Sequence, residues 1–109
     1  MYEVNSETID IFERVPYYLW DDNNLTRSAL AVFAYIMDNR SDDGLCHKSN
    51  PEIAKALGYK HARSVQYPLK ALEAAGYTTR DHRGPYRWIQ LTEKALDVIE
   101  RSNDERQIA

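Results

Sequence analysis

The sequence predicts an α+β fold in which three helices form a core and are followed by a two-stranded hairpin and a last helix. Two observations support this order. Apolar residues recur at helical spacing in segments that begin at capping residues and end at glycine or at polar turn residues. Two β-prone segments then flank a Gly-Pro pair, as the strands of a hairpin do. The length of 109 residues suits one domain with a single modest core.

Residues 1–24 are expected to form an N-terminal extension. Partial alternation of apolar and polar residues over 9–15 predicts a short strand that ends at Pro16. An apolar and aromatic segment, 17–20, comes next, and the polar residues 21–24 are typical of a turn.

The main domain is expected to span residues 25–101. Its first helix is predicted to begin after Thr26, which can serve as an N-cap. The apolar positions of this helix recur at i, i+3, i+4, i+7 and i+8 and form one buried stripe, consisting of Ala29, Val32, Phe33, Ile36 and Met37. Residues 39–44 then turn the chain, and residues 45–47 predict a very short strand.

The second helix of the domain is predicted to begin at a cap supplied by Ser49 or Asn50 and to end at Gly58. Pro51 then occupies the first helical position, which proline favours, and glycine is the usual residue at the left-handed end of a helix. The third helix is expected to stop at Gly76. Its inward residues are spaced at i, i+4 and i+7 and are Val65, Leu69 and Leu72.

Residues 77–80 and 86–91 are predicted to be the strands of the hairpin, joined by a turn over 81–85. A last helix is expected to be capped by Thr92 and to run through Arg101. Its apolar residues are Leu96, Val98 and Ile99. Residues 102–109 are expected to form a frayed tail.

Charge is distributed unevenly along the chain, whose formal net charge is −3. Residues 44–90 carry eight Lys and Arg against three Asp and Glu, a net charge of +5. Residues 1–43 carry three against nine, and residues 91–109 carry three against five. An acidic protein therefore contains a basic segment, and local positive charge on a helical unit suits a surface that binds phosphates.

The outer face of the third helix is polar and contains no carboxylate. Its residues recur at i, i+3, i+4 and i+7 within an arc of about 100°, and they are Arg63, Gln66, Tyr67 and Lys70. Arg and Gln can hydrogen-bond guanine and adenine edges bidentately in the major groove of DNA, and Lys can contact phosphates or guanine. This pattern favours contact with a DNA groove. The alternative is an ordinary solvated face, which more often mixes both signs of charge.

Three segments occur in an order that resembles a known superfamily. They are 51–58 (PEIAKALG), 64–77 (SVQYPLKALEAAGY) and 86–94 (YRWIQLTEK). At this spacing, residues 25–91 resemble the winged helix-turn-helix superfamily of bacterial, phage and plasmid DNA-binding proteins. The preceding residues 15–26 resemble the N-terminal domains of replication initiators and related small regulators. The resemblance implies that the third helix enters the major groove and that the hairpin is a wing on the DNA backbone or in the minor groove.

The resemblance assigns a set of residues to DNA contact. Those of the hairpin cluster around Gly84-Pro85 and are Arg80, His82, Arg83 and Arg87. Those of the helices and the turn are Ser49, Lys60, His61, Arg63, Ser64, Gln66, Tyr67 and Lys70. The alternative for the hairpin is that its charges only keep the sheet edge soluble.

Two features depart from the superfamily pattern. The turn between Gly58 and the third helix is about one residue longer than usual. Pro68 lies inside the third helix, where a proline removes one backbone hydrogen bond and costs about 3 kcal/mol. The helix is therefore expected either to begin later or to be kinked near Ser64, and a kink would change which side chains reach the groove.

The function that the pattern favours is sequence-specific binding of double-stranded DNA by a small transcriptional regulator. One alternative is a replication initiator of a phage or plasmid. Another is a protein-interaction module in which the acidic residues 1–43 face a basic partner, since the fold alone does not decide function. A homodimer is expected because one helix-turn-helix touches few base pairs. Its surface would combine Leu96, Val98 and Ile99 with the N-terminal aromatics Tyr17, Tyr18 and Trp20.

The sequence argues against other chemistry. No pair among Cys46, His47, His61 and His82 has the spacing of zinc ligands. The sequence also lacks a phosphate-binding Gly-rich loop and a nucleophile elbow, so we expect no metal, no cofactor and no enzymatic activity. The longest apolar run, 29–37, has nine residues and is too short to cross a bilayer. A single cysteine and an N-terminus without a signal-peptide pattern lead us to expect a cytoplasmic protein.

Overall fold

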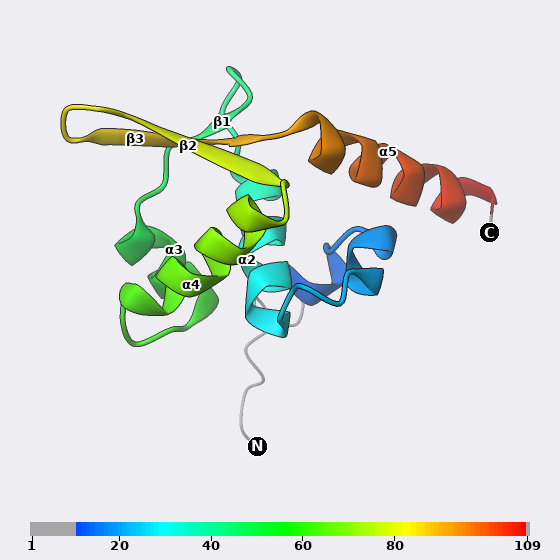
Figure 1. The fold of residues 1–109 in the computed structure, drawn as a ribbon, viewed down its shortest axis with the longest axis horizontal. Coiled ribbons are helices and arrows are strands. Elements are labelled where there is room, and N and C mark those ends of the chain that lie inside the picture. The colour runs from blue at the N-terminus through cyan, green and yellow to red at the C-terminus, as the bar shows by residue number, and fades with distance from the viewer. Residues whose placement is uncertain (1–10, 109) are drawn as a thin grey trace.

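Three helices lie beneath a small sheet, and a fourth helix projects from one end of that sheet (Figure 1). The computed structural model describes the backbone of residues 11–108 and the side chains of residues 11–104. The helices are η1 (Tyr17–Asp21, a 3-10 helix), α2 (Arg27–Asp38), α3 (Asn50–Leu57), α4 (Arg63–Ala74) and α5 (Glu93–Ile108). The strands β1 (Leu45–Cys46), β2 (Thr78–Arg83) and β3 (Tyr86–Leu91) form an antiparallel sheet in the order β1-β3-β2. The predicted α+β class and the predicted order of core elements are confirmed.

The strand predicted in the N-terminal segment is wrong for the residues that the structure describes. Residues 11–13 are helical, whereas residues 9 and 10 lie outside the described residues. Ile11, Val15 and Leu19 are all buried in the core, although only Ile11 lies in this helical turn and Leu19 belongs to η1. Burial of these three side chains in the core outweighs the partial alternation of the sequence, so the segment packs into the main domain.

α2 is the central helix of the core, and the Thr26 side chain caps it by accepting a hydrogen bond from the Ala29 N–H at 3.2 Å, as predicted. Residues 29–34 and Ile36 are all buried, so the expected single apolar stripe is too narrow. Because α2 packs against both α3 and α4, it is enclosed on several sides. The Arg14 guanidinium also reaches Asp38 at the end of α2, with both distances below 3.0 Å.

α3 begins and ends as predicted. The Ser49 side chain and the Glu52 side chain form a reciprocal capping box, and Pro51 lies in the first turn. The helix ends at Gly58, whose φ of +76° is the left-handed conformation that favours glycine at this position.

α4 runs without interruption from Arg63 to Ala74 and contains Pro68. The helix includes Arg63 and Ser64, so it does not begin later than expected. Pro68 is buried with Leu69 on the side of α4 that faces the core, where its ring adds apolar contact. A proline has no N–H to donate to the Ser64 carbonyl, so one helical hydrogen bond is lost. Burial of the ring offsets this loss.

The hairpin is longer than predicted. β2 continues to Arg83, and Arg83 pairs with Tyr86, so only Gly84 and Pro85 form the loop instead of the five residues expected. Gly84 has a φ of +60°, which suits the first central position of a tight hairpin turn. β1 pairs with the base of β3 through Leu45↔Gln90 and Cys46↔Ile89, which confirms the short strand at residues 45 and 46.

α5 is also longer than predicted. It was expected to end at Arg101 and to be followed by a frayed tail, but the helix continues to Ile108. Ser102 is buried, and its hydroxyl accepts a hydrogen bond from the Tyr18 N–H at 3.1 Å and donates to the Val98 carbonyl at 2.7 Å. These hydrogen bonds hold α5 against η1 at a residue that lies just beyond the predicted end of the helix. None of the described helices is long and apolar enough to cross a membrane.

Candidate nucleic-acid interface

The polar face of α4 lies opposite its buried face, as the helical spacing predicts. Val65, Leu69 and Leu72 have no exposed area. The α4 residues that were predicted to contact DNA are all exposed, and they are Arg63, Ser64, Gln66, Tyr67 and Lys70. Tyr67 is the most exposed large apolar side chain among the described residues, at 77%. The structure therefore brings the five predicted residues of α4 onto one open surface, and the carboxylate of Glu73, at the end of this stripe, is paired with Arg80.

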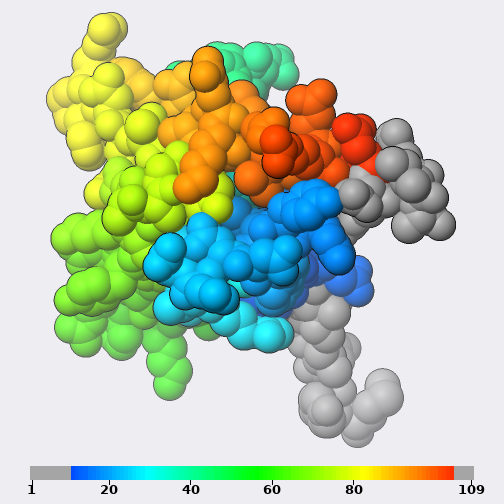
Figure 2. Space-filling model, turned by 45° about the vertical axis from the view of Figure 1, so that its right-hand side comes forward, coloured from blue at the N-terminus to red at the C-terminus, as the bar shows by residue number. Residues whose placement is uncertain are grey.

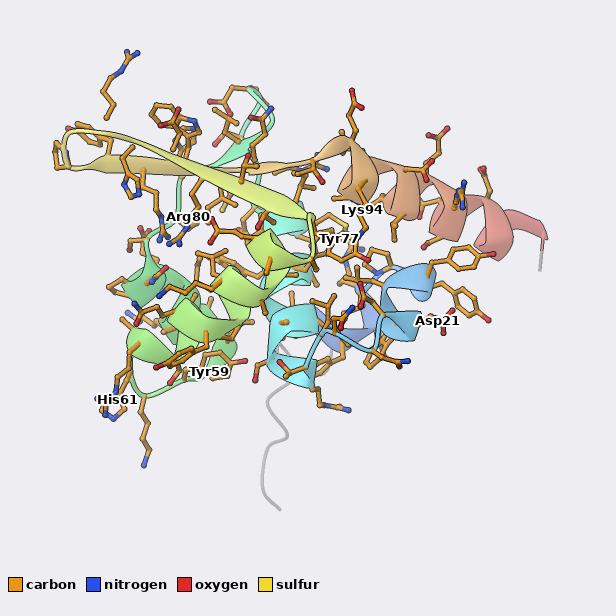
Figure 3. The ribbon with its side chains drawn as sticks, viewed as in Figure 1. Asp21, Tyr59, His61, Tyr77, Arg80 and Lys94 are labelled. Carbon is orange, nitrogen blue, oxygen red and sulfur yellow. The ribbon has the colours of Figure 1, made fainter. Side chains whose placement is uncertain are left out.

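The turn between α3 and α4 extends this surface. Lys60 and His61 are exposed there, as expected of contacts to DNA, and His61 points away from the core beneath α4 (Figure 3). A shallow groove of about 420 Å³ runs beside the turn, and both Lys55 and Lys60 line it. Lys55 was not predicted as a contact from the sequence, although its place in the last turn of α3 was a usable signal.

Ser49, which was predicted to contact DNA, has a structural role within the protein. Its hydroxyl accepts from the Glu52 N–H at 3.3 Å and lies 3.0 Å from Glu52 Oε1. The Ser49 backbone N–H, which donates to Glu52 Oε1 at 3.1 Å, and then the Ser49 hydroxyl lower the pKa of the Glu52 carboxyl. The Ser49 side chain is therefore engaged in capping α3.

The four basic residues predicted on the hairpin do not share one face. Side chains alternate along a strand, and the cross-strand pairs Arg80↔Ile89 and His82↔Arg87 fix one face of the hairpin. Because Ile89 is buried, this face is directed at the helices. Arg83 pairs with Tyr86 on the opposite face, and both are exposed.

Arg80 and Arg87 are held by partners within the protein. Arg80 forms two hydrogen bonds of 2.9 Å with the Glu73 carboxylate of α4, and Figure 3 shows Arg80 beneath the hairpin on the side of the helices. Arg87 donates to the Lys48 carbonyl at 2.6 Å and to Asn50 Oδ1 at 2.7 Å. Burial, together with the nearby Arg80 charge, lowers the pKa of Arg87.

The exposed groups at the hairpin tip are His82, Arg83 and Tyr86. Tyr86 is 73% exposed and was missed by the sequence analysis, because an aromatic residue in a strand is more often part of a core. Among the residues that the structure describes, Arg83 forms no ion pair, and the same holds for Lys60, Arg63 and Lys70.

The basic part of the chain gathers on one side of the molecule. In Figure 2 the hairpin lies above α3 and α4 on the left, whereas the N-terminal segment and α5 lie to the right. Residues 44–90 carry the net charge of +5 computed from the sequence, so the left side is the basic side. Within residues 11–104, no group of three or more His, Cys, Asp and Glu side chains is arranged to hold a metal ion.

No protein-family model matches the chain. A stretch of 57 residues is 42% identical to the LexA repressor of Xanthomonas campestris and covers 52% of this chain and 26% of that protein. LexA repressor 2 of Xanthomonas oryzae pv. oryzae matches with the same identity and the same coverage. The matched residues therefore span about a quarter of the length of these relatives.

Solved structures also resemble the chain. MepR, a transcription regulator of the Staphylococcus aureus multidrug efflux pump MepA, superposes with a TM-score of 0.62 at 18% identity over 96% of this chain and 80% of MepR. MepR in its complex with DNA superposes with a TM-score of 0.59 at 19% identity over 94% of this chain and 81% of MepR. At this identity the likeness shows the fold, and the winged helix-turn-helix fold that the sequence predicts is confirmed.

Proposed function

We propose that this winged helix-turn-helix protein binds double-stranded DNA in a sequence-specific way and acts as a transcriptional regulator. α4 would lie in the major groove, and the β2–β3 hairpin, the wing, would lie on the backbone or in the minor groove. The observation that carries this proposal is the open face of α4, formed by Arg63, Gln66, Tyr67 and Lys70, on the same basic side of the molecule as the wing tip.

The chemistry of the exposed groups supports the proposal. Arg63 and Gln66 can each make two hydrogen bonds to a purine edge, and Lys60 and Lys70 can contact phosphates. The comparisons point the same way, because the LexA proteins are named repressors and MepR is named a transcription regulator and has been solved with DNA. Transcriptional regulation through DNA binding requires no catalytic step by this chain.

A titration against DNA tests this function. Labelled random duplex and duplex taken from around the gene of this protein are titrated by fluorescence polarisation at several salt concentrations. Up to five unpaired cations (Lys55, Lys60, Arg63, Lys70 and Arg83) can meet phosphates, so the log–log salt dependence should have a slope of about −4 to −5 for each protomer. The interaction-module alternative predicts no duplex binding even at low salt, and that result would end the proposal.

We also propose that the protein acts as a homodimer through its terminal segments. Tyr17 is 58% exposed, Trp20 43% and Leu96 44%. These three side chains come from η1 and α5, which pack against each other. Val98 and Ile99, which were expected on the same surface, are half-buried and pack against the core of their own chain. The dimer surface would therefore rest on the exposed aromatics and Leu96.

A further inference from the structure

The inner face of the wing changes in character from its base to its tip. At the base, Thr78 pairs with Leu91, and both are buried against the helices. Arg80 and Ile89 form the next inner pair, and Arg87 lies beyond them opposite His82. Apolar packing thus supports the base, and the two half-buried arginines are the inner-face groups that reach the helices nearer the tip.

Each arginine reaches a different helix. Arg80 joins β2 to Glu73 in the last part of α4 through two parallel hydrogen bonds, the arrangement in which a guanidinium is most firmly oriented. Arg87 joins β3 to the start of α3 through Asn50 and to the preceding loop through the Lys48 carbonyl. We name Arg80, Arg87, Glu73 and Asn50 the arginine brace.

The strand pairing that the wing makes with β1 lies at its base. β1 pairs with β3 only at Gln90 and Ile89, so strand pairing with β1 ends before Arg87. His82, Arg83 and Tyr86 at the tip are exposed. The angle between the wing and α4 therefore depends on the arginine brace, because a two-stranded ribbon by itself is only marginally stable and twists readily.

We propose that Arg80 and Arg87 are positioning residues that hold the wing at a fixed angle to α4, and that direct DNA contact by the wing falls to Arg83 and its exposed neighbours at the tip. This inference rests on the proposed DNA binding for its functional consequence. It reassigns two of the four basic wing residues from contact with DNA to contact with α3 and α4. A wing held in place lets both elements meet DNA without a further loss of conformational freedom on binding.

Glu73 provides a test in which the two interpretations predict opposite signs. If wing charge acts only through attraction to phosphates, removing the Glu73 carboxylate should strengthen DNA binding, by a factor of about two to five. If the arginine brace positions the wing, Glu73→Gln should weaken binding severalfold, because fewer molecules hold the wing in the binding-competent position. Asp81→Asn is the matched control, since it also removes one acid, in this case an exposed one on the wing itself, and Asp81 is not part of the brace.

Hydrogen exchange of the DNA-free protein tests the brace without reference to DNA. Glu73→Gln and Asn50→Ala should each raise the exchange rates of amides in residues 80–88 by about tenfold, because each removes a hydrogen bond to a half-buried guanidinium. Asp81→Asn should leave these rates unchanged except at the His82 amide, whose N–H donates to Asp81 Oδ1 at 2.8 Å. The charge swap Glu73→Arg with Arg80→Glu keeps the net charge and should return exchange and DNA affinity towards the values of the unaltered protein. Thermal melting checks that each variant is folded.

The outcomes separate the two proposals. Faster exchange of the wing together with weaker binding by Glu73→Gln and Asn50→Ala supports the positioning role. If Glu73→Gln and Asn50→Ala leave the exchange rates of the wing amides unchanged, the positioning role is overturned. It is also overturned if the charge-swap variant is folded but its wing amides exchange as fast as those of Glu73→Gln. If Glu73→Gln binds DNA as tightly as the unaltered protein, or more tightly, the proposed effect of the arginine brace on DNA binding is overturned. Failure of the unaltered protein to bind any duplex would instead refute the proposed function, and the exchange measurements would still decide the brace.

Discussion

The Tyr77 hydroxyl donates a hydrogen bond of 2.7 Å to Asp22 Oδ2 and so ties the N-terminal segment to the start of the wing. The Lys94 ammonium of α5 lies 4.4 Å from the centroid of the Tyr77 ring and donates to the Ala75 carbonyl at 2.6 Å. Figure 3 shows Tyr77 and Lys94 side by side at this junction. Segments from both ends of the chain thus meet where α4 leads into β2, and the position of the wing base depends on them.

Stability at high pH should depend on Tyr77. Burial, and then the hydrogen bond to Asp22, raises the pKa of Tyr77 to about 12, above its ordinary value of about 10. A raised pKa means that this contribution is fully present below about pH 10 and is lost as the pH rises towards 12. We expect the unaltered protein to be more stable than Tyr77→Phe at neutral pH, with the difference shrinking by about 2 kcal/mol across this window.

Chemical denaturation at a series of pH values measures this difference. Tyr67→Phe is the control, because Tyr67 is exposed and its removed hydroxyl lies outside the junction with Asp22. A constant difference between the unaltered protein and Tyr77→Phe from about pH 9 to 12 would contradict the assignment. At low pH the sign is opposite, because the Tyr77 hydrogen bond lowers the pKa of Asp22, and its contribution is lost as the pH falls through that lowered value.

Ser102 should hold η1 against α5. Ser102→Ala removes the hydrogen bonds with the Tyr18 N–H and the Val98 carbonyl, and we expect a loss of about 1 kcal/mol in the free energy of unfolding. Amide exchange should rise in η1 and in the second half of α5 but not in α4. Asn103→Ala, at the exposed neighbouring position, is the control. Uniform changes across all helices in Ser102→Ala would show that the tether is not local.

Thr78 should be replaceable by valine without loss of stability. Its Oγ1 is buried and has no hydrogen-bond partner in the described structure, and an unsatisfied buried hydroxyl is unfavourable. We expect Thr78→Val to leave the free energy of unfolding unchanged or to raise it by about 1 kcal/mol.

Thr92→Val provides the contrast for that measurement. The Thr92 hydroxyl donates to the Gly76 carbonyl at 2.6 Å and accepts from the Ala95 N–H at 3.2 Å. Its loss should cost about 1–2 kcal/mol, as the loss of an N-cap does. Urea denaturation compares the two variants directly, and a Thr78→Val variant as unstable as Thr92→Val would point to a partner for Thr78.

Local signals explain why much of the fold could be predicted from the sequence. Ser49, Pro51 and Gly58 are residues whose own backbone preferences set the ends of a helix, so α3 is predictable without knowledge of its neighbours. The exposed face of α4 follows in the same way from the spacing of Val65 and Leu69.

The errors arise where distant segments decide the structure. Residues 11–13 are helical, and Ile11 and the following Val15 are buried in the core of the main domain, which no local pattern reveals. Arg80 and Arg87 look like ligands for phosphate in the sequence, yet their partners come from α4, from α3 and from the loop before α3. Charge alone gives no indication of whether an arginine is already paired.

Arg63 should contribute to sequence discrimination, and Arg83 to affinity alone. Arg63→Ala should cost about 1–3 kcal/mol on a specific site and less on random duplex, as expected for a side chain that contacts a base edge. Arg83→Ala should weaken binding to both duplexes equally and should flatten the log–log salt dependence by about one unit. Polarisation titrations on both duplexes separate these effects. Equal losses on both duplexes for Arg63→Ala would show that Arg63 only contacts phosphate.

The homodimer should depend on the exposed apolar side chains of the terminal segments. Leu96→Glu combined with Trp20→Glu places charge on this surface, and a charge buried without a partner at an interface is strongly unfavourable. Both side chains are more than 40% exposed, so the variant should remain folded. We expect sedimentation to show a dimer for the unaltered protein at high micromolar concentration and a monomer for the variant.

The geometry of DNA binding makes this dimer informative. η1 and α5 lie away from the basic side of the molecule in Figure 2, so two copies joined there could each present α4 to one half-site of a palindromic duplex. The monomeric variant should then bind a single half-site as tightly as the unaltered protein does but lose the gain in affinity on two half-sites, since joining two modules makes the second contact intramolecular. Lys60→Ala at the α3–α4 turn should weaken both kinds of site and leave sedimentation unchanged. A protein that stays monomeric at high concentration, both free and on a two-half-site duplex, would rule out the dimer and leave a single α4 and its wing to supply all of the specificity.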